Sequence, residues 1–515
     1  MLDPKQVVIL SVPYCEPYPM VAPVLLSACL NRAGITSKGI DFSILFLEHF
    51  SSKPYYVNLK NFLTSYGMGE HQLDRHVFRE VLKFTRKFLL DLVDQHQPEY
   101  IGLSIFSIDS LDFGLFFAYC IRRYCPGVKI IAGGKGLEIP HLNREYHYEI
   151  WHRNGVADII VVGDAEIEII DSIRQGKTGI VHAQQQTKDQ LDAIPVPQWQ
   201  EYDLYKYQKF GSFIDAPNQT VVQKIEPYMA ITGSKGCVRQ CTFCDVIKFQ
   251  PKYIYRDPAR VAEEIIHNYQ HTGINRFHFT DNLINGSISN YRRMNEILAA
   301  TVPGEIKYQG YAIFRGQHQM PERDFELAAA AGCVKWVIGV ESGSERVRTD
   351  MKKKFTNSDI DWSVEMLVKY KIDQVWLLMV GYPTETDDDF NDTRRLLEKY
   401  QALARDNQVL IGLTPTFMLT TNAPLLSDAL LAESHGVAHN LDNQDMAKFW
   451  TSTVNPSNTY QVRSRRYKEL LDLIDTRGFN LHQGMTLQKS LEEIKHLDQL
   501  YHEKQNKIIA IHPAS

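Results

Sequence analysis

The stretch GSKGCVRQCTFCDV, residues 233–246, decides how this chain of 515 residues is interpreted. It places Cys237, Cys241 and Cys244 in the spacing C-x3-C-x2-C on one short, glycine-containing loop. Three thiolates in this arrangement can bind three irons of a [4Fe–4S] cluster, and they leave the fourth iron without a protein ligand. The pattern therefore predicts a cluster with one open iron.

Two other interpretations of these cysteines are weaker. A structural zinc site needs four ligands, usually two C-x2-C pairs or paired histidines, and no second pair lies nearby. A chance grouping of buried thiols is improbable, because the chain has only eight cysteines in 515 residues. An open iron, by contrast, can chelate the amino and carboxylate groups of S-adenosylmethionine (SAM) and pass it one electron.

The motif resembles the signature of the radical SAM superfamily, in which an aromatic residue, here Phe243, precedes the last cysteine. The resemblance implies that Cys237, Cys241 and Cys244 hold a [4Fe–4S] cluster. It also implies that SAM binds beside Phe243 and is cleaved to a 5′-deoxyadenosyl radical.

Length and composition favour a globular protein of two or three domains. Apolar residues make up 44% of the chain, and 56 basic against 61 acidic residues give a net charge of −5, so nucleic acid is not indicated as a partner. No apolar run is long enough for a membrane span and the first residues do not read as a secretory signal, so we expect a cytoplasmic protein. The remaining cysteines are scattered and odd in number, which predicts small core residues and no disulfide framework; they are Cys15, Cys29, Cys120, Cys125 and Cys333.

The N-terminal part, residues 1–197, alternates apolar strands with helices. This pattern predicts an α/β domain with a Rossmann-like, doubly wound parallel sheet, whose ligands sit beyond the carboxyl ends of the strands. Ser104, Gly133 and Gly134 follow strands at that edge, and Asp41 ends another strand. Glycines at these positions either let a ligand approach the backbone closely or form an ordinary tight turn. The expected strands are 7–11, 35–41, 100–106, 128–132 and 157–162, and the expected helices are 23–33, 74–95, 111–124 and one from residue 166.

This part also resembles the cobalamin-binding domain that is fused to radical SAM domains, through phrases such as YIGLSIFS, VKIIAGGKGLEIPH and DIIVVGDAEIEI. The resemblance implies that Ser104, Gly133 and Gly134 lie near the dimethylbenzimidazole tail of cobalamin and that Gly163 opens the turn that follows. Residues 12–23 contain no histidine, so no D-x-H-x-x-G motif supplies a lower ligand to cobalt. The alternative is a domain that keeps the fold and has lost the cofactor.

The middle part, residues 198–426, contains six further βα units, with strands expected at 228–232, 275–280, 305–312, 334–340, 374–380 and 409–416. Six strands are fewer than the eight of a closed barrel. The resemblance implies a partial (β/α)6 TIM-type barrel, which is the radical SAM core domain.

Polar residues at the strand ends of such a barrel are candidates for function. Each could instead cap a turn. By resemblance, Glu341 and Ser342 hold the ribose or methionyl part of SAM, and Gly381 and Pro383 pass beside its adenine. Asp281 is expected to contact cofactor or substrate. We interpret the basic run 352–354 as a solvated helix end.

Residues 427–515 carry helical patterns and no cysteine, which predicts a mainly helical C-terminal region. Its basic quartet, residues 463–466, either docks this region or meets an anionic substrate.

The resemblance implies a cobalamin-dependent radical SAM enzyme of the BchE-like, class B methyltransferase group, which is expected to methylate an unactivated carbon. Its cofactors are the [4Fe–4S] cluster, SAM and cobalamin, and a flavodoxin or ferredoxin is the expected reducing partner. One alternative is a radical SAM enzyme that performs cyclisation or rearrangement beneath an empty cobalamin-like lid. Another is a cluster- and corrin-binding redox sensor without turnover.

Overall fold

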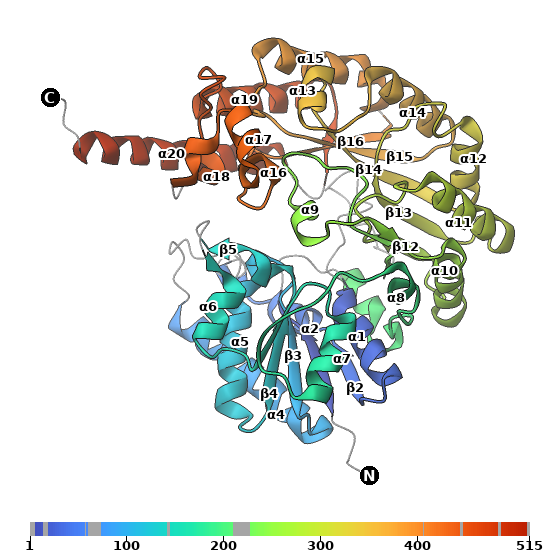
Figure 1. Cartoon of the computed structure of the whole chain (residues 1–515), viewed down its shortest axis with the longest axis vertical. Coiled ribbons are helices and arrows are strands. Elements are labelled where there is room, and N and C mark those ends of the chain that lie inside the picture. The colour runs from blue at the N-terminus through green and yellow to red at the C-terminus, as the bar shows by residue number, and fades with distance from the viewer. Residues whose placement is uncertain are drawn as a thin grey trace. The chain divides into compact units, whose positions relative to one another are not determined.

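The computed structural model describes residues 6–13, 19–56, 58–59, 74–141, 145–209, 227–404, 406–442, 446–482 and 486–511. The chain forms two compact units, and the boundary between them falls between Ala230 and Ile231 (Figure 1). Residues 198–209, which the sequence assigns to the second domain, lie in the first unit, where Trp199 is buried. The C-terminal region belongs to the second unit. Residues 210–226 and Cys15 lie outside the described residues.

The first unit is built on a six-stranded sheet in the order β2-β1-β3-β4-β7-β8, in which every pair of neighbours is parallel. The order reverses direction at β1, so the adjacent ends of β1 and β3 form the switch point where doubly wound sheets bind ligands. The strands are β1 (Val7–Ser11), β2 (Ser37–Ile40), β3 (Tyr100–Ser104), β4 (Lys129–Gly133), β7 (Ile159–Val162) and β8 (Gly179–His182). A short hairpin adds β5 (Pro140–His141) and β6 (Glu145–Tyr146).

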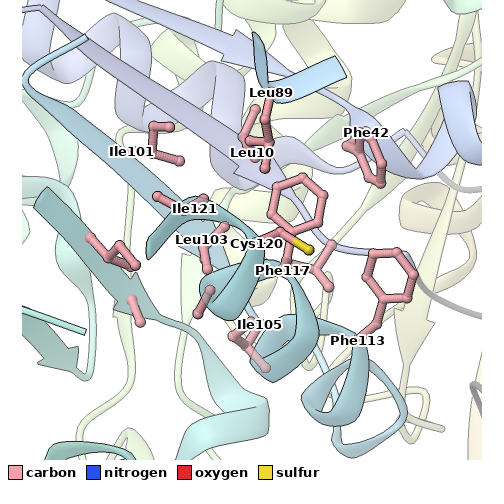
Figure 2. Packing of buried hydrophobic residues seen from close by; sticks show 14 of the residues in the cluster. Leu10, Phe42, Leu89, Ile101, Leu103, Ile105, Phe113, Phe117, Cys120 and Ile121 are labelled. Atoms are coloured by element: carbon pink, nitrogen blue, oxygen red, sulfur yellow. The ribbon is translucent and has the colours of Figure 1, made fainter. Parts of the chain in front are cut away.

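Alternate residues of the central strands pack on opposite faces of this sheet. Val7 and Ile9 join a core with α1 and α7, whereas Val8 and Leu10 join a second core with α2, α4 and α5. Figure 2 shows this second core, where Phe42 and Phe117 pack beside Leu10. The doubly wound α/β prediction is therefore confirmed. The helices of this unit are α1 (Val21–Arg32), α2 (Phe42–Phe50), α4 (Arg75–His96), α5 (Leu111–Tyr124), α6 (His147–Arg153), α7 (Ala165–Gln175) and α8 (Lys188–Asp192).

Several elements of the first unit were not expected from the sequence, among them α2 and β8. Helix α2 follows β2 directly because the Asp41 side chain accepts bonds from the backbone N–H groups of Ser43 and Ile44 and so caps the helix. Strand β8 is only four residues long and lies half-buried at the sheet edge, so its apolar signal is weak.

The second unit contains a seven-stranded sheet in the order β17-β16-β15-β14-β13-β12-β9. The six expected strands are confirmed, and β17, from the C-terminal region, adds a seventh beside β16. Among the described residues no ladder joins β9 to β17, so the barrel is open. The strands are β9 (Met229–Ile231), β12 (Arg276–Phe279), β13 (Lys307–Ala312), β14 (Cys333–Glu341), β15 (Asp373–Leu378), β16 (Val409–Leu413) and β17 (Asn480–Leu481).

Helices cover the outer side of this sheet, as Figure 1 shows for α10, α11, α12 and α14. Trp336 of β14 points to this side and packs against Phe325 of α12 and Tyr291 of α11. The helices are α9 (Val246–Phe249), α10 (Pro258–Thr272), α11 (Ile288–Thr301), α12 (Glu322–Ala330), α13 (Glu345–Asp350), α14 (Asn357–Lys369), α15 (Asp387–Lys399), α16 (Pro424–Ser427), α17 (Ala429–Ser434), α18 (Met446–Phe449), α19 (Tyr460–Thr476) and α20 (Leu487–Ile511). Within the described ranges, no helix has both the length and the apolar character needed to cross a bilayer.

Candidate functional site

The three-cysteine loop is closed at its base by a short antiparallel ladder. Strand β10 (Ser234–Lys235) precedes the cysteines and pairs with β11 (Ile254–Tyr255), which follows them. Between these strands Gly236 has a φ of +76°, and a Cβ there would lie 2.3 Å from the carbonyl oxygen of Lys252. Only glycine fits this turn, because both its backbone angle and its surroundings exclude a side chain.

Asp281, which follows β12, forms hydrogen bonds with the start of the three-cysteine loop. Its carboxylate accepts the backbone N–H of Gly233 at 2.7 Å and the hydroxyl of Ser234 at 2.5 Å. Burial raises the pKa of Asp281 to about 7, although these hydrogen bonds favour the charged form. Both oxygens therefore have partners from the loop base, and a contact of Asp281 with cofactor or substrate stays a prediction.

The three thiols lie close enough for the charge of one to affect the pKa of the others. Burial raises the pKa of each, to about 12 for Cys244, and the charge on Cys237 raises the pKa of both Cys241 and Cys244. Metal binding displaces such protons. Among the described residues no three acidic, histidine or cysteine side chains surround a point that would hold a single ion. Three thiols on one loop are the donors that proteins use to bind iron–sulfur clusters, so the chemistry of this donor set fits a cluster.

Glu341 ends β14 as a buried ion pair with Lys353. The ammonium of Lys353 lies 3.0 Å from the Glu341 carboxylate and 5.7 Å from the ring centre of Phe243. Burial alone would lower the pKa of Lys353, but the charges of Glu341 and of Cys241 outweigh burial and raise it. Lys353 is only 8% exposed, so the interpretation of this basic run as a solvated helix end is wrong for Lys353.

The sequence contained one indication of the Glu341–Lys353 ion pair, the glycine at position 339. A Cβ at position 339 would lie 2.3 Å from the Glu341 carboxylate and 2.8 Å from the Lys353 ammonium. Glu341 itself has a φ of +66°, which is uncommon for a residue with a side chain. The glycine makes room for the pair, and the left-handed backbone turns the carboxylate towards Lys353.

Ser342 is fully buried and lies against α15. Its hydroxyl accepts the backbone N–H of Ser344 at 3.2 Å, and its carbonyl accepts a bond from Arg348 at 2.7 Å. The expected contact of Ser342 with SAM stays a prediction, and its hydroxyl already has a partner in the chain.

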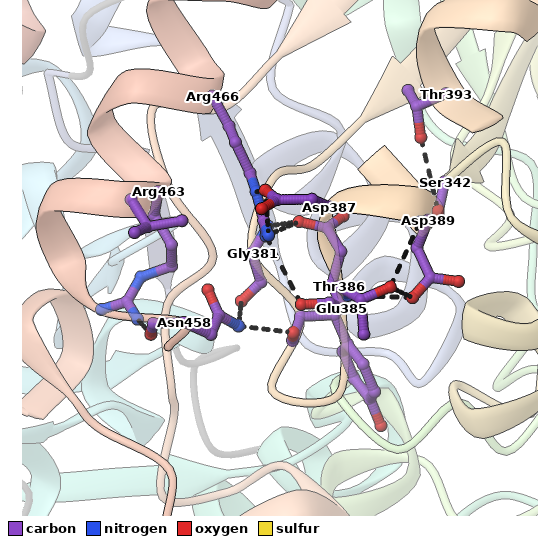
Figure 3. Close-up of polar contacts among 12 residues, drawn as sticks. Ser342, Gly381, Glu385, Thr386, Asp387, Asp389, Thr393, Asn458, Arg463 and Arg466 are labelled. Atoms are coloured by element: carbon purple, nitrogen blue, oxygen red, sulfur yellow. Dashed lines mark hydrogen bonds and ion pairs between the residues drawn. The ribbon is translucent and has the colours of Figure 1, made fainter. Parts of the chain in front are cut away.

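The Gly381–Pro383 turn after β15 is held by the C-terminal region (Figure 3). The backbone N–H of Gly381 donates to Glu385 at 2.8 Å, and Glu385 forms a buried ion pair with Arg466 of α19 at 2.9 Å. Asn458 donates from Nδ2 to the carbonyl of Tyr382, also at 2.8 Å. The basic quartet therefore docks the C-terminal region through Arg466, as one of the two interpretations expected.

Tyr382 connects this turn to the cysteine loop. Its hydroxyl lies 2.8 Å from Oγ1 of Thr242, which sits between Cys241 and Phe243, and 2.9 Å from Nε2 of His435. The sequence gives no local signal for this contact, because Thr242 and Tyr382 are 140 residues apart. The loop, the β15 turn and the C-terminal region thus form one hydrogen-bonded assembly.

Replacing Gly381 with alanine is expected to lower the free energy of unfolding by about 2–4 kcal/mol. Gly381 has a φ of +89°, and a Cβ there would lie 2.2 Å from Cδ of Arg463, whose guanidinium stacks on Trp450. Gly478→Ala is the matched control, because Gly478 has a φ of +78° and no atom within 4 Å of its Cβ position. Chemical denaturation should give a loss of only about 1 kcal/mol for the control; equal losses would contradict the packing argument.

In the first unit, the residues expected to contact cobalamin meet at the carboxyl edge of the sheet. Ser104 and Gly133 are register partners in neighbouring strands, and Gly163 follows the next strand. Gly134 has a φ of +111°, and a Cβ there would lie 2.4 Å from the carbonyl oxygen of Ile105. Packing within the unit therefore explains this glycine, whereas the carboxyl edge of the sheet is where doubly wound folds bind their ligands.

Two acidic residues of the first unit, Asp41 and Glu138, accept hydrogen bonds from other residues of the chain. Asp41 accepts from the hydroxyls of Ser11 and Tyr207 and caps α2, and burial raises its pKa. Glu138, which the sequence reasoning missed, accepts the backbone N–H of Gly163 at 3.1 Å. It shapes the turn at which the resemblance places the cofactor.

The second unit is thus an open parallel barrel with a three-thiol loop at the carboxyl edge of its strands, an arrangement that suits an iron–sulfur cluster. Residues 231–397 match the radical SAM superfamily. The chain therefore contains a radical SAM domain, and this family implies a [4Fe–4S] cluster and SAM as cofactors.

The chain is also similar to relatives with curated names. The chain is 28% identical over 296 residues to cytidylyl-2-hydroxyethylphosphonate methyltransferase of Streptomyces wedmorensis, covering 55% of this chain and 51% of that protein. It is 22% identical over 302 residues to anaerobic magnesium-protoporphyrin IX monomethyl ester cyclase of a Synechocystis strain, covering 54% and 55%. The chain thus spans about half the length of these relatives.

Two solved structures share the fold. The radical SAM methyltransferase TsrM from Kitasatospora setae, with tryptophan and a SAM analogue bound, superposes with a TM-score of 0.55 at 16% identity, covering 82% of this chain and 75% of TsrM. The apo form of the cobalamin-dependent SAM radical enzyme OxsB gives a TM-score of 0.59 at 14% identity, covering 98% of this chain and 81% of OxsB. The predicted architecture, a Rossmann-like unit followed by a partial barrel and helices, is confirmed.

Proposed function

We propose that this protein is a cobalamin-dependent radical SAM enzyme that methylates an unactivated carbon. The observation that carries the proposal is the three-thiol loop, which is framed by β10 and β11 and lies within the radical SAM match. Cys237, Cys241 and Cys244 would hold the cluster, which would supply one electron for the reductive cleavage of SAM. A flavodoxin or ferredoxin is the proposed source of that electron.

The chain's own residues would hold the reactants. Cys237, Cys241 and Cys244 bind the cluster, while Asp281 and the hairpin fix the position of their loop. Gly381 to Pro383 support the adenine of SAM, held in place by Asn458 and Glu385. The ribose or methionyl part lies beside Glu341 and Ser342.

The proposed methyl transfer is tested with SAM labelled at its methyl group. Reconstituted protein, a strong reductant and hydroxocobalamin are incubated with candidate substrates, and both 5′-deoxyadenosine and the label in the product are measured. Label in the product supports methyl transfer. An unlabelled but altered product, formed together with 5′-deoxyadenosine, would instead support the cyclisation or rearrangement suggested by the cyclase relative. SAM binding without 5′-deoxyadenosine would favour the sensor.

Cobalamin is proposed at the edge where Ser104, Gly133, Gly134 and Gly163 meet. The support is this edge and the solved relative OxsB, whose structure contains aqua-cobalamin. Purification with hydroxocobalamin should yield a protein with a corrin absorption spectrum. Ser104→Trp should reduce the retained corrin at least about tenfold by filling the edge, whereas Arg123→Trp, at the exposed end of α5, should not. A colourless wild-type protein would support the empty lid.

A further inference from the structure

Two arginines, one within the three-cysteine loop and one after β13, have no carboxylate partner among the described residues. Arg315 follows β13 and is only 9% exposed, and its Nη2 donates to the backbone carbonyls of Asn285 at 3.0 Å and Gly286 at 3.2 Å. Its Nε is buried and has no hydrogen-bond partner. Carbonyl groups carry no net charge, and an uncompensated buried ion costs several kcal/mol. The Arg315 cation therefore calls for a counter-charge that the described side chains do not supply.

Arg239 lies within the loop itself, between Cys237 and Cys241. Its backbone N–H donates to the Sγ atom of Cys237 at 3.4 Å, while its side-chain Nε is buried without a partner. The carboxylate that acts on it electrostatically is Asp359, which caps α14 through the backbone N–H of Thr356. Neither Arg239 nor Arg315 forms an ion pair within the part of the chain that the structure describes.

The loop after β12 holds Arg315 close to the cysteines. Asn282 donates to the carbonyl of Gly236, the residue before Cys237, at 3.0 Å. Three residues further on, Asn285 exchanges two hydrogen bonds with the backbone of Ile313, at 2.8 and 3.1 Å, and its carbonyl accepts from Arg315. The pKa of Arg315 is lowered to about 10, mainly by burial and also by the charge of Arg239, while Tyr253 and Cys237 act in the opposite direction.

Lys353 provides the contrast. It is another buried cation near the thiols, but the Glu341 carboxylate at 3.0 Å neutralises it. Arg315 and Arg239 have no such carboxylate among the described residues.

We propose that Arg315 and Arg239 are the counter-charges of the iron–sulfur cluster and raise its reduction potential. The inference rests on the proposed function only in placing a cluster at Cys237, Cys241 and Cys244. Three thiolates make the bound cluster anionic, and accepting one electron from the external reductant adds another negative charge. A nearby cation in a medium of low dielectric constant stabilises the reduced cluster more than the oxidised one. The pair would thus make the electron transfer to the cluster easier.

The test measures the midpoint potential of the cluster in full-length, reconstituted protein without SAM, by redox titration followed with electron paramagnetic resonance. Arg315→Gln and Arg239→Gln should each lower the ratio of reduced to oxidised cluster at a fixed potential about tenfold, equivalent to about 59 mV for a one-electron couple. Arg315→Lys keeps the charge and should stay near the wild type. Arg477→Gln removes an arginine that pairs with Glu398 and should leave the midpoint unchanged.

An unchanged or higher midpoint in both glutamine variants would overturn the inference. If Arg315→Gln does not retain its cluster, Arg239→Gln decides alone. Weaker SAM binding with an unchanged midpoint would assign the guanidinium groups to the carboxylate of SAM and also overturn it. A wild-type protein that forms no four-iron cluster would instead refute the proposed function, so the two failures are distinguishable.

Discussion

Cys241→Ser is expected to abolish both the four-iron absorbance of the reconstituted protein and the release of 5′-deoxyadenosine. Cys241 is buried, and Thr242 beside it is bonded to Tyr382, so the ligand position is fixed by the surrounding structure. A cluster held by three protein ligands cannot lose one of them and keep the same open iron. Cys237→Ser and Cys244→Ser should behave in the same way. The readouts are the absorbance spectrum, the iron content and the nucleoside product after reduction.

Cys333→Ser is the matched control for this prediction. Cys333 is also buried in the second unit, but it opens β14 and lies 3.6 Å from the hydroxyl of Tyr291, away from the loop. This variant should keep the four-iron absorbance and the nucleoside release. Nucleoside release that survives serine at any of the three loop positions would refute the assignment of the cluster ligands.

Lys353→Met is expected to lower the free energy of unfolding of the second unit by about 3–5 kcal/mol. The substitution leaves the Glu341 carboxylate buried and unpaired, since Lys353 is its ion-pair partner at 3.0 Å. Removing both charges should cost much less, because a neutral pair needs no compensation. The double variant Lys353→Met/Glu341→Gln should therefore recover most of the lost stability.

Tryptophan fluorescence can follow this transition. Four of the six tryptophans, Trp336, Trp362, Trp376 and Trp450, lie in the second unit, so denaturant unfolding monitored by fluorescence reports mainly on that unit. Lys352→Met, one position away on the exposed side, is the control and should change stability by less than about 0.5 kcal/mol. A double variant as unstable as Lys353→Met would show that Lys353 acts through packing and not through its charge.

Much of the fold could be predicted because its signals are local. The expected strands at 7–11 and 409–416 begin where β1 and β16 begin, since continuous β-branched runs mark buried strands in parallel sheets. The helix at 111–124 matches α5 residue for residue. Strand β17 was not predicted, because a strand of two residues shows no alternation of apolar and polar side chains. These two residues form a strand only through their pairing with β16.

The cysteines of the candidate site could be predicted for the same reason, because their signal is also local. The three cysteines stand within eight residues of each other, so their spacing alone indicates the chemistry. Lys353 was misjudged because its neighbours Lys352 and Lys354 are exposed and a run of three lysines usually faces water. The partner that buries Lys353 is Glu341, twelve residues earlier on another element.

The sequence by itself indicated the class of domain and the three cysteines that are proposed to bind the cluster, because ligand spacing and strand patterns are properties of short segments. Only the tertiary structure decided what surrounds them. The Tyr382–Thr242 contact, the Arg466–Glu385 pair and the position of Arg315 near the loop join residues that are distant in the chain. The physical reason is that burial sets the cost of leaving a charge or a hydroxyl without a partner, and burial exists only once the chain has folded.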